Sequence, residues 1–170
     1  MALPQRKRMR LKGYDYSNAG CYFVTICTHN KKKLFGDVER LNSIGAIIDE
    51  EINNIPTYYD DVKIDKYIIM PDHVHILLKI GCDALPNDDD VIINEVLNKT
   101  EHHKLDRIVG LFKAGATRRI HQFEPDIVVW QRSFYDHIVT NKNEYNEIWN
   151  YIDTNPIRWE IKHGIDSMNI

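Results

Sequence analysis

The sequence has no long hydrophobic run, no close cysteine pair and no strong net charge, and each absence excludes a class of protein. None of its apolar stretches reaches the roughly 20 residues that a helix needs to cross a bilayer, so we expect no membrane span. Its three cysteines form no C-x-x-C pair, and their odd number closes no disulfide framework, so we expect reduced thiols. Residues 1–13 are basic, but no apolar segment of a secretory signal follows them. These features predict a cytoplasmic protein.

The composition that is present fits one soluble globular domain over residues 1–170. Of the 170 residues, 43% are hydrophobic and 28% are charged, which suffices for one core, whereas the chain is short for two domains. The sequence contains no internal repeat, coiled coil or low-complexity segment. We therefore expect the function to reside in a single folded unit.

Charge is unevenly distributed, although the net charge is only −3. A basic arm covers residues 1–13, a second basic cluster lies near residues 113–119, and an acidic insertion covers residues 81–104. The basic candidates for phosphate contact are Arg6, Lys7, Arg8, Arg10 and Lys12 in the arm, with Lys113, Arg118 and Arg119 in the cluster. Taken alone, either cluster is also explained by a solvated surface.

Hydrophobic periodicity predicts alternating strands and helices. Strands are predicted over residues 21–29, 62–70 and 73–80, and within residues 127–139. Helices are predicted over residues 41–55, ended by Pro56, over residues 105–120, and from Asn141 to Pro156. This order indicates an α+β fold with a ferredoxin-like (split β-α-β) antiparallel sheet, helices on one face, an open face for a ligand and an appended C-terminal helix.

Two histidines separated by one residue mark the strand predicted over residues 73–80. Successive side chains of a strand point to opposite faces, so His73 and His75 share one face while Val74 and Ile76 lie on the other. Lys79 shares the histidine face, and we therefore expect that face to border a groove or solvent. Because histidine is the commonest metal ligand, the pair is a candidate metal site, with two solvated imidazoles as the alternative.

Tyr151 and Asn155 form a second candidate pair, on the last predicted helix. The apolar stripe of this helix comprises Tyr145, Ile148, Trp149 and Ile152. At roughly 100° per residue, Tyr151 lies about 120° from the centre of that stripe, and Asn155 follows one turn later on nearly the same side. The alternative is a partly exposed tyrosine, with an asparagine that merely ends the helix before a proline.

Together the two pairs indicate phosphodiester cleavage. Two imidazoles and a carboxamide oxygen can bind a divalent ion, and the Tyr151 phenol supplies a nucleophile. Such an ion polarises a phosphoryl oxygen while the phenol attacks phosphorus and forms a covalent phosphotyrosine.

At these residues the chain resembles the REP-associated tyrosine transposases, a group of single-tyrosine HUH transposases. The resemblance lies in the blocks MPDHVH from Met70 to His75, WQRSFYDH from Trp130 to His137, and YIDTNP from Tyr151 to Pro156. The blocks occur in the order typical of the family, and the resemblance extends over residues 13–164.

The resemblance implies a divalent-metal-dependent transposase, a DNA nicking and joining enzyme that acts on single-stranded DNA hairpins formed by palindromic repeats. It implies that His73 and His75, with Asn155 as a third contact, bind Mg²⁺ or Mn²⁺. It also implies that Tyr151 is the nucleophile, which keeps the 5′ end of the cut strand and releases a 3′ hydroxyl. Arg132 and His137 belong to the second block and join the basic residues as candidates for DNA contact.

Two other functions remain open at this point. A ferredoxin-like sheet can bind single-stranded nucleic acid without cutting it, as a domesticated transposase does, and binding in a chelator favours that function. A small metallohydrolase uses its ion to activate water, with Tyr151 as a bystander. The sequence also leaves undecided whether the protein is a homodimer and whether Tyr151 serves the histidines of its own chain.

Overall fold

The computed structural model of the chain describes residues 19–82 and 104–164. Its elements in chain order are β1 (Gly20–Cys27), the short 3-10 helix η1 (His29–Lys31), α1 (Ser43–Tyr58), β2 (Val62–Met70), β3 (His73–Ile80), α2 (Lys104–Ile120), β4 (Tyr135–Val139) and α3 (Lys142–Gly164). The predicted basic arm and most of the predicted acidic insertion lie outside the described residues. In the described part, no helix is long and apolar enough to cross a membrane.

The four strands form one antiparallel sheet in the order β2-β3-β1-β4. Pro71 and Asp72 form the turn between β2 and β3, which places Met70 opposite His73. β1 lies between β3 and β4 and pairs antiparallel with both. This is the ferredoxin-like α+β arrangement that the order of predicted elements indicates, and the predicted fold class is confirmed.

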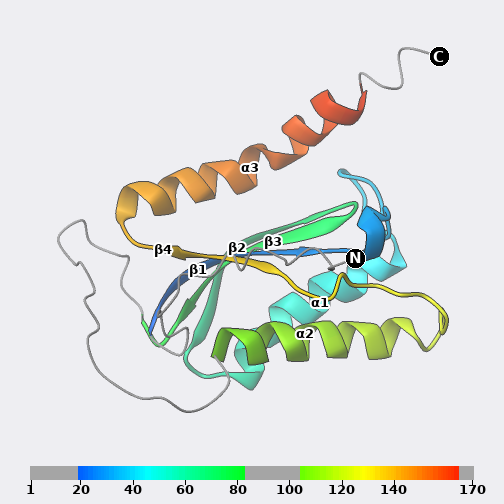
Figure 1. Cartoon of the computed structure of the whole chain (residues 1–170), viewed down its shortest axis with the longest axis horizontal. Helices are drawn as coiled ribbons and strands as arrows, with labels where there is room; N and C mark the ends of the chain where they lie inside the picture. Colours follow the sequence, from blue (N-terminus) through cyan, green and yellow to red (C-terminus); the bar gives the residue numbers. More distant parts are fainter. Residues whose placement is uncertain (1–18, 83–103, 165–170) are drawn as a thin grey trace, which may run out of the picture.

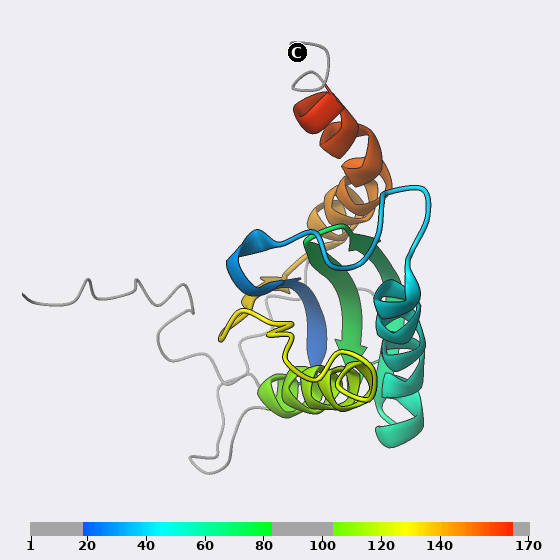
Figure 2. The same cartoon turned by 90° about the vertical axis from the view of Figure 1, so that its right-hand side faces the viewer.

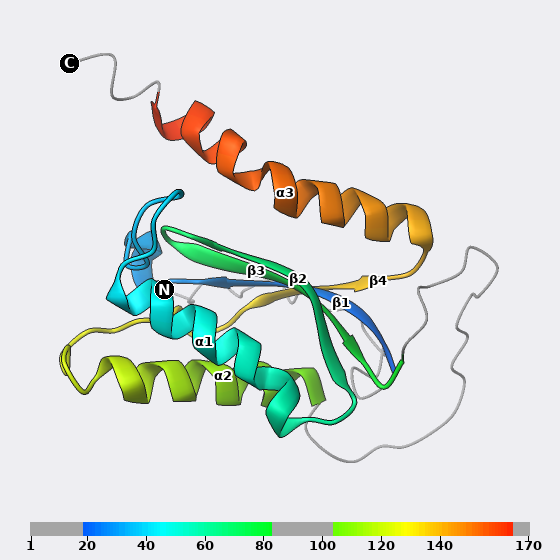
Figure 3. The same ribbon diagram turned by 180° about the vertical axis from the view of Figure 1, so that it is seen from behind.

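Helices lie on both faces of this sheet (Figure 1). α1 and α2 pack together on one face, and α3 crosses the opposite face, as the turned views also show (Figures 2 and 3). The face predicted to be open for a ligand is therefore partly covered by the appended helix. Any site on that face must lie between the sheet and α3.

The main core lies between the sheet and the layer formed by α1 and α2. Val74 and Ile76 of β3 point into it, as the alternation predicts, and share one buried cluster with Ile48 and Ile52 of α1. Burying an aliphatic side chain stabilises a fold by about 1.5–3 kcal/mol. The core thus fixes the face of β3 on which the histidines lie.

A smaller apolar cluster attaches α3 to the other face of the sheet. Tyr145 and Ile152, the buried members of the predicted stripe, pack with Phe23 of β1 and Leu77 of β3. The Tyr145 hydroxyl also donates a hydrogen bond of 2.8 Å to Asp65 of β2. These contacts determine which side chains of α3 face the sheet.

The two prolines that were predicted to end helices instead lie inside them. α1 continues past Pro56, and α3 continues past Pro156. A proline lacks the N–H that bonds to the carbonyl four residues earlier, so each helix loses one hydrogen bond at that point. In α3 the next turn gains a tertiary contact, because the Trp159 ring lies 5.8 Å from the His73 ring.

The first strand also ends earlier than predicted. β1 stops at Cys27, and the chain turns at η1, where Asn30 and Lys31 have φ angles of 54° and 56°. Left-handed backbone of this kind breaks a strand and costs a non-glycine residue about 1–2 kcal/mol. The turn places η1 beside the end of β3 that begins with His73.

Candidate active site

The histidine pair lies at the start of β3, on the face covered by α3. Thr25 and Cys27 of β1 are the strand partners of His75 and His73. The two Nε2 atoms are 3.1 Å apart, and the ring centroids are separated by 4.6 Å. The predicted sharing of one face is confirmed, and the two rings approach one point in space.

The other ring nitrogen of each histidine, Nδ1, lies within hydrogen-bond distance of a neighbouring oxygen. The Nδ1 atom of His75 lies 2.8 Å from Oγ1 of Thr25, and Nδ1 of His73 is hydrogen-bonded to the carboxylate of Asp72. When Nδ1 of each ring carries the proton and donates it to these oxygens, both Nε2 lone pairs are available to one ligand. Oxygen partners of this kind orient metal-binding histidines in known metal sites.

His75 is more deeply buried than the sequence predicts. Its exposed fraction is 4%, and its ring stacks on Phe23 at 5.2 Å. Burial is the main cause that lowers the pKa of His75 from 6.5 to about 3, and the nearby His73 lowers it further. His75 is therefore neutral near pH 7, which is the form that can bind a metal ion.

Lys79 departs from the prediction in the same way. It was expected to border a groove or solvent, yet only 8% of it is exposed. Burial is tolerated because its Nζ forms an ion pair of 2.9 Å with Asp65 and lies 5.6 Å from the ring centre of Tyr145. Covering of this face by α3 explains why both residues are buried.

The pKa of His75 predicts that the fold is destabilised in acid. Between pH 6.5 and about 3, the unfolded chain binds a proton at this residue that the folded chain does not. The contribution of neutral His75 to the free energy of unfolding is present above pH 6.5. It is lost as the pH falls below that value, at up to about 1.4 kcal/mol per pH unit. Urea unfolding between about pH 7 and pH 5 should show a smaller loss of stability for His75→Gln than for the wild type. Equal losses in the two proteins contradict a buried neutral His75.

α3 places Tyr151 directly against the histidine pair. The Tyr151 hydroxyl lies 3.5 Å from Nε2 of His75 in the same chain. Its ring centre is 5.2 Å from that of His75 and 6.0 Å from that of Phe23. The position of Tyr151 away from the apolar stripe, predicted from helical periodicity, brings its hydroxyl to the imidazoles.

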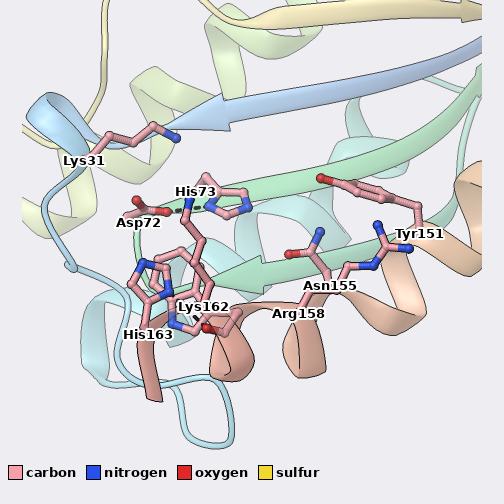
Figure 4. A pocket seen from close by; sticks show the side chains of 9 residues that line it. Lys31, Asp72, His73, Tyr151, Asn155, Arg158, Lys162 and His163 are labelled. Carbon is pink, nitrogen blue, oxygen red and sulfur yellow. Dashed lines mark hydrogen bonds and ion pairs between the residues drawn. The ribbon is translucent and has the colours of Figure 1, made fainter. Parts of the chain in front are cut away.

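Asn155 lies in the same place, one helical turn after Tyr151. The residue is only 7% exposed, yet within residues 19–82 and 104–164 its side chain has no hydrogen-bond partner. Figure 4 shows its carboxamide between Tyr151 and His73, in a pocket of about 350 Å³. The pocket thus contains an available amide as well as the phenol and the imidazole.

The fit of this donor set to a divalent ion can be judged from the side chains themselves. In the described part of the chain, no three His, Cys, Asp or Glu residues gather into a metal site. The two imidazoles therefore need the oxygen of Asn155 as a third donor, and imidazole with amide oxygen is a donor set that divalent ions accept. The residues present fit the ion that the sequence predicts.

Among the described residues, the predicted DNA contacts on α2 do not line this pocket. Arg118 is exposed on α2, across the sheet from α3. Arg119 forms ion pairs with Glu50 and Glu51 of α1 and so joins the two helices. These residues remain candidates for contacts with DNA outside the pocket, and so do the residues of the basic arm, which lie outside the described part.

His137 and Arg132 also lie apart from the pocket. His137 pairs with Glu144 at the start of α3, which supports a hydrogen-bonding role within the fold. Arg132 is exposed in the segment before β4. Their contact with DNA stays a prediction.

Three cationic residues that line the pocket were missed by sequence reasoning, namely Lys31, Arg158 and Lys162. Arg158 follows Tyr151 by two helical turns, so periodicity alone places it near the same side. The prediction that Pro156 ends the helix concealed this signal. Lys31 had no signal, because its position depends on the left-handed turn after β1.

No family model matches the chain, but known proteins resemble it in sequence and in structure. It is 36% identical over 164 residues to an uncharacterized protein of Haemophilus influenzae, covering 91% of this chain and 90% of that protein. It is 24% identical over 156 residues to a Haemophilus influenzae protein named "putative REP-associated tyrosine transposase", covering 88% of this chain and 75% of that protein.

Two solved structures share the fold. A REP-associated tyrosine transposase bound to a REP hairpin matches with a TM-score of 0.58 and 15% identity, over 92% of this chain and 74% of that chain. A "putative transposase" from Deinococcus radiodurans matches with a TM-score of 0.50 and 18% identity, over 86% of this chain and 98% of that chain.

The fold therefore places the chain in the class of α+β proteins that includes these transposase structures. The chain belongs to one family with the 36% identical Haemophilus influenzae protein, and its resemblance to the REP-associated tyrosine transposases is confirmed.

Proposed function

We propose that the protein is a single-strand DNA endonuclease and strand transferase of the HUH transposase type, which cuts at hairpin-forming palindromic DNA. The observation that supports this most strongly is the 3.5 Å between the Tyr151 hydroxyl and Nε2 of His75 in one chain. The similarity to transposases supports the enzyme class. A REP hairpin bound to one relative supports hairpin DNA as the substrate.

His73, His75 and Asn155 are the residues that bind Mg²⁺ or Mn²⁺ in this proposal. When bound there, such an ion would supply positive charge to offset the negative charge that develops on the phosphoryl oxygens. The contacts of Thr25 and Asp72 with the two Nδ1 atoms keep both rings turned toward the same point. Phe23 and α3 keep water away from His75, which remains neutral and able to bind.

Tyr151 performs the covalent step. Its Oη attacks phosphorus as the phenol proton passes to water, and the bond between phosphorus and the 3′ oxygen breaks. The 3′ oxygen leaves as a hydroxyl after taking a proton from water, and the 5′ phosphate stays on Tyr151. Attack of a 3′ hydroxyl on this linkage restores the phenol and joins the strand, so no nucleotide hydrolysis is needed.

The experiment that tests this function uses the full chain, Mn²⁺ and an oligonucleotide that forms a hairpin with single-stranded flanks. A denaturing gel should show label from the 3′ end attached to the protein and label from the 5′ end on a shorter free strand. Binding that persists in a chelator without any adduct favours the non-catalytic module. Multiple turnovers without an adduct favour the metallohydrolase.

Thr25→Val should weaken the metal site without disturbing the fold. Valine keeps the shape of threonine but removes the oxygen that contacts Nδ1 of His75 at 2.8 Å. Loss of such an oxygen partner lowers metal affinity by about 10- to 100-fold in known sites. Calorimetric titration with Mn²⁺ measures the change, and Thr117→Val on α2 is a control that keeps the wild-type affinity. An unchanged affinity in Thr25→Val contradicts the role given to this oxygen.

A further inference from the structure

The pocket beside Tyr151 contains more positive than negative charge. Lys31 of η1 lies on one side, and Arg158 and Lys162 of α3 lie on the other (Figure 4). Among the described residues, none of these three side chains forms an ion pair. The carboxylate in the pocket, Asp72, is already hydrogen-bonded to His73. The charge of the three cations is therefore available to an anionic ligand.

Arg158 is a cation that lies against the ring of the proposed nucleophile. Its guanidinium carbon is 5.5 Å from the ring centre of Tyr151. Figure 4 shows the guanidinium extending along the pocket toward Tyr151, next to Asn155. A cation over the face of an aromatic ring is attracted by the negative charge of that face, which favours this orientation. The planar guanidinium can donate two parallel hydrogen bonds to a phosphate.

Lys31 and Lys162 lie on different elements, η1 and α3, and both line the pocket (Figure 4). Trp159 lies on α3 among these cations, with its ring 5.8 Å from His73 and stacked on His163 at 4.0 Å. A single DNA strand carries one negative charge per nucleotide. The two lysines lie at the end of the pocket away from Tyr151 (Figure 4), where a phosphate next to the reacting one can contact both.

We propose that this pocket binds two consecutive phosphates of one DNA strand, the reacting phosphate at Arg158 and its neighbour between Lys31 and Lys162. This inference rests on the proposed function for the identity of the reacting phosphate. Arg158 is a further catalytic residue that donates hydrogen bonds to non-bridging oxygens while Tyr151 Oη forms its bond to phosphorus and the 3′ oxygen departs. The same contact stabilises the phosphotyrosine that remains.

Arg158→Ala tests whether Arg158 binds the reacting phosphate. The single-turnover rate of adduct formation should fall by about 10²- to 10³-fold, the usual effect of removing one donor to a developing oxyanion. Arg158→Lys should recover part of the rate, because it restores the charge without the paired donors. Mn²⁺ affinity should stay at the wild-type value in both variants. Arg107→Ala, an exposed arginine on α2, is the matched control with an unchanged rate.

A neutral substrate separates a direct contact from a structural effect. Replacing a non-bridging oxygen of the reacting phosphate by a methyl group removes the charge that Arg158 binds. On this methylphosphonate, the difference between wild type and Arg158→Ala should shrink to below about tenfold, as expected when both changes remove one interaction. If Arg158→Ala loses the same factor in rate on both substrates, a direct contact between Arg158 and the reacting phosphate is contradicted.

The lysine pair is tested by binding, which needs neither metal nor cleavage. Anisotropy of a fluorescein-labelled thymidine oligonucleotide should show weaker binding for Lys31→Ala/Lys162→Ala, with a salt slope smaller by about 0.7 for the lost phosphate. If the wild type forms no adduct but this slope still falls, the proposed function fails and the anion site stands. If the wild type is active and neither Arg158→Ala nor the lysine variant differs from it, the two-phosphate site is contradicted while the proposed function stands.

Discussion

Tyr151→Phe should abolish the covalent protein–DNA adduct, with a loss of at least about 10³-fold, the scale seen when a nucleophile is removed. The change deletes the oxygen that lies 3.5 Å from Nε2 of His75 and leaves the ring that packs on Phe23. The fold and the Mn²⁺ affinity should therefore stay near those of the wild type. A denaturing gel of the hairpin reaction measures the adduct, and circular dichroism verifies the fold.

Tyr145→Phe is the matched control for this prediction. Tyr145 lies on the same helix and also faces the sheet, but its hydroxyl donates to Asp65. Burial and this carboxylate raise the pKa of Tyr145 far above its usual range, so its phenol does not ionise to act as a nucleophile. Adduct formation should persist in Tyr145→Phe. An adduct that survives in Tyr151→Phe and disappears in Tyr145→Phe would contradict the assignment.

His75→Gln should remove measurable Mn²⁺ binding, with an affinity loss of at least about 100-fold, since a direct ligand contributes no less than its supporting oxygens. It deletes one of two Nε2 atoms that are 3.1 Å apart, and Asn155 with His73 alone offers too few donors. Glutamine retains a polar side chain of similar size, which limits the disturbance to the buried site. Adduct formation should be lost together with the metal.

The control for the loss of Mn²⁺ binding in His75→Gln is a substitution of a histidine outside the pocket. His121 is exposed after α2, and its Nε2 lies 2.9 Å from the carbonyl oxygen of Ile127. His121→Ala should therefore keep the Mn²⁺ affinity of the wild type in the same calorimetric titration. If His75→Gln binds Mn²⁺ as tightly as this control, the histidine pair is not the metal site.

Much of the fold follows from local sequence patterns. The bounds of β2 and β3 agree with the predicted strands, because alternation in β3 and the two-residue turn at Pro71 and Asp72 leave one register. The start of α3 was also predictable, since Asn141 accepts a hydrogen bond from the Glu144 N–H at 2.8 Å. In these segments, the local sequence preferences and the tertiary packing favour the same structure.

The site was only partly predictable, because its walls depend on tertiary packing. Periodicity identified His73, His75 and Tyr151, but it did not show that α3 covers the sheet and buries Lys79. Because Pro156 was expected to end the helix, Arg158 was not a candidate. In the structure, packing of the next turn near His73 outweighs the tendency of a proline to end a helix. Sequence patterns specify faces of elements, whereas burial depends on which element lies opposite.

The pairing of Tyr151 with a particular histidine pair was undecidable from sequence. The structure shows an arrangement within one chain, because β4 leads into α3, which returns across the sheet over β2 and β3. The apolar contacts of Tyr145 and Ile152 hold that path. A single chain therefore brings the phenol, both imidazoles and Asn155 together, with His73, Tyr151 and Asn155 lining one pocket.

We expect Tyr151 to become covalently linked to DNA beside the histidine pair. Mass spectrometry of the adduct that the wild type forms with Mn²⁺, digested with trypsin and nuclease, identifies the linked residue. The peptide covering residues 143–158 contains both Tyr145 and Tyr151, and its fragment ions distinguish them. The expected result is a nucleotide attached through its 5′ phosphate to Tyr151. A nucleotide on any other residue, or no linked nucleotide in a reaction that cuts the hairpin, contradicts it.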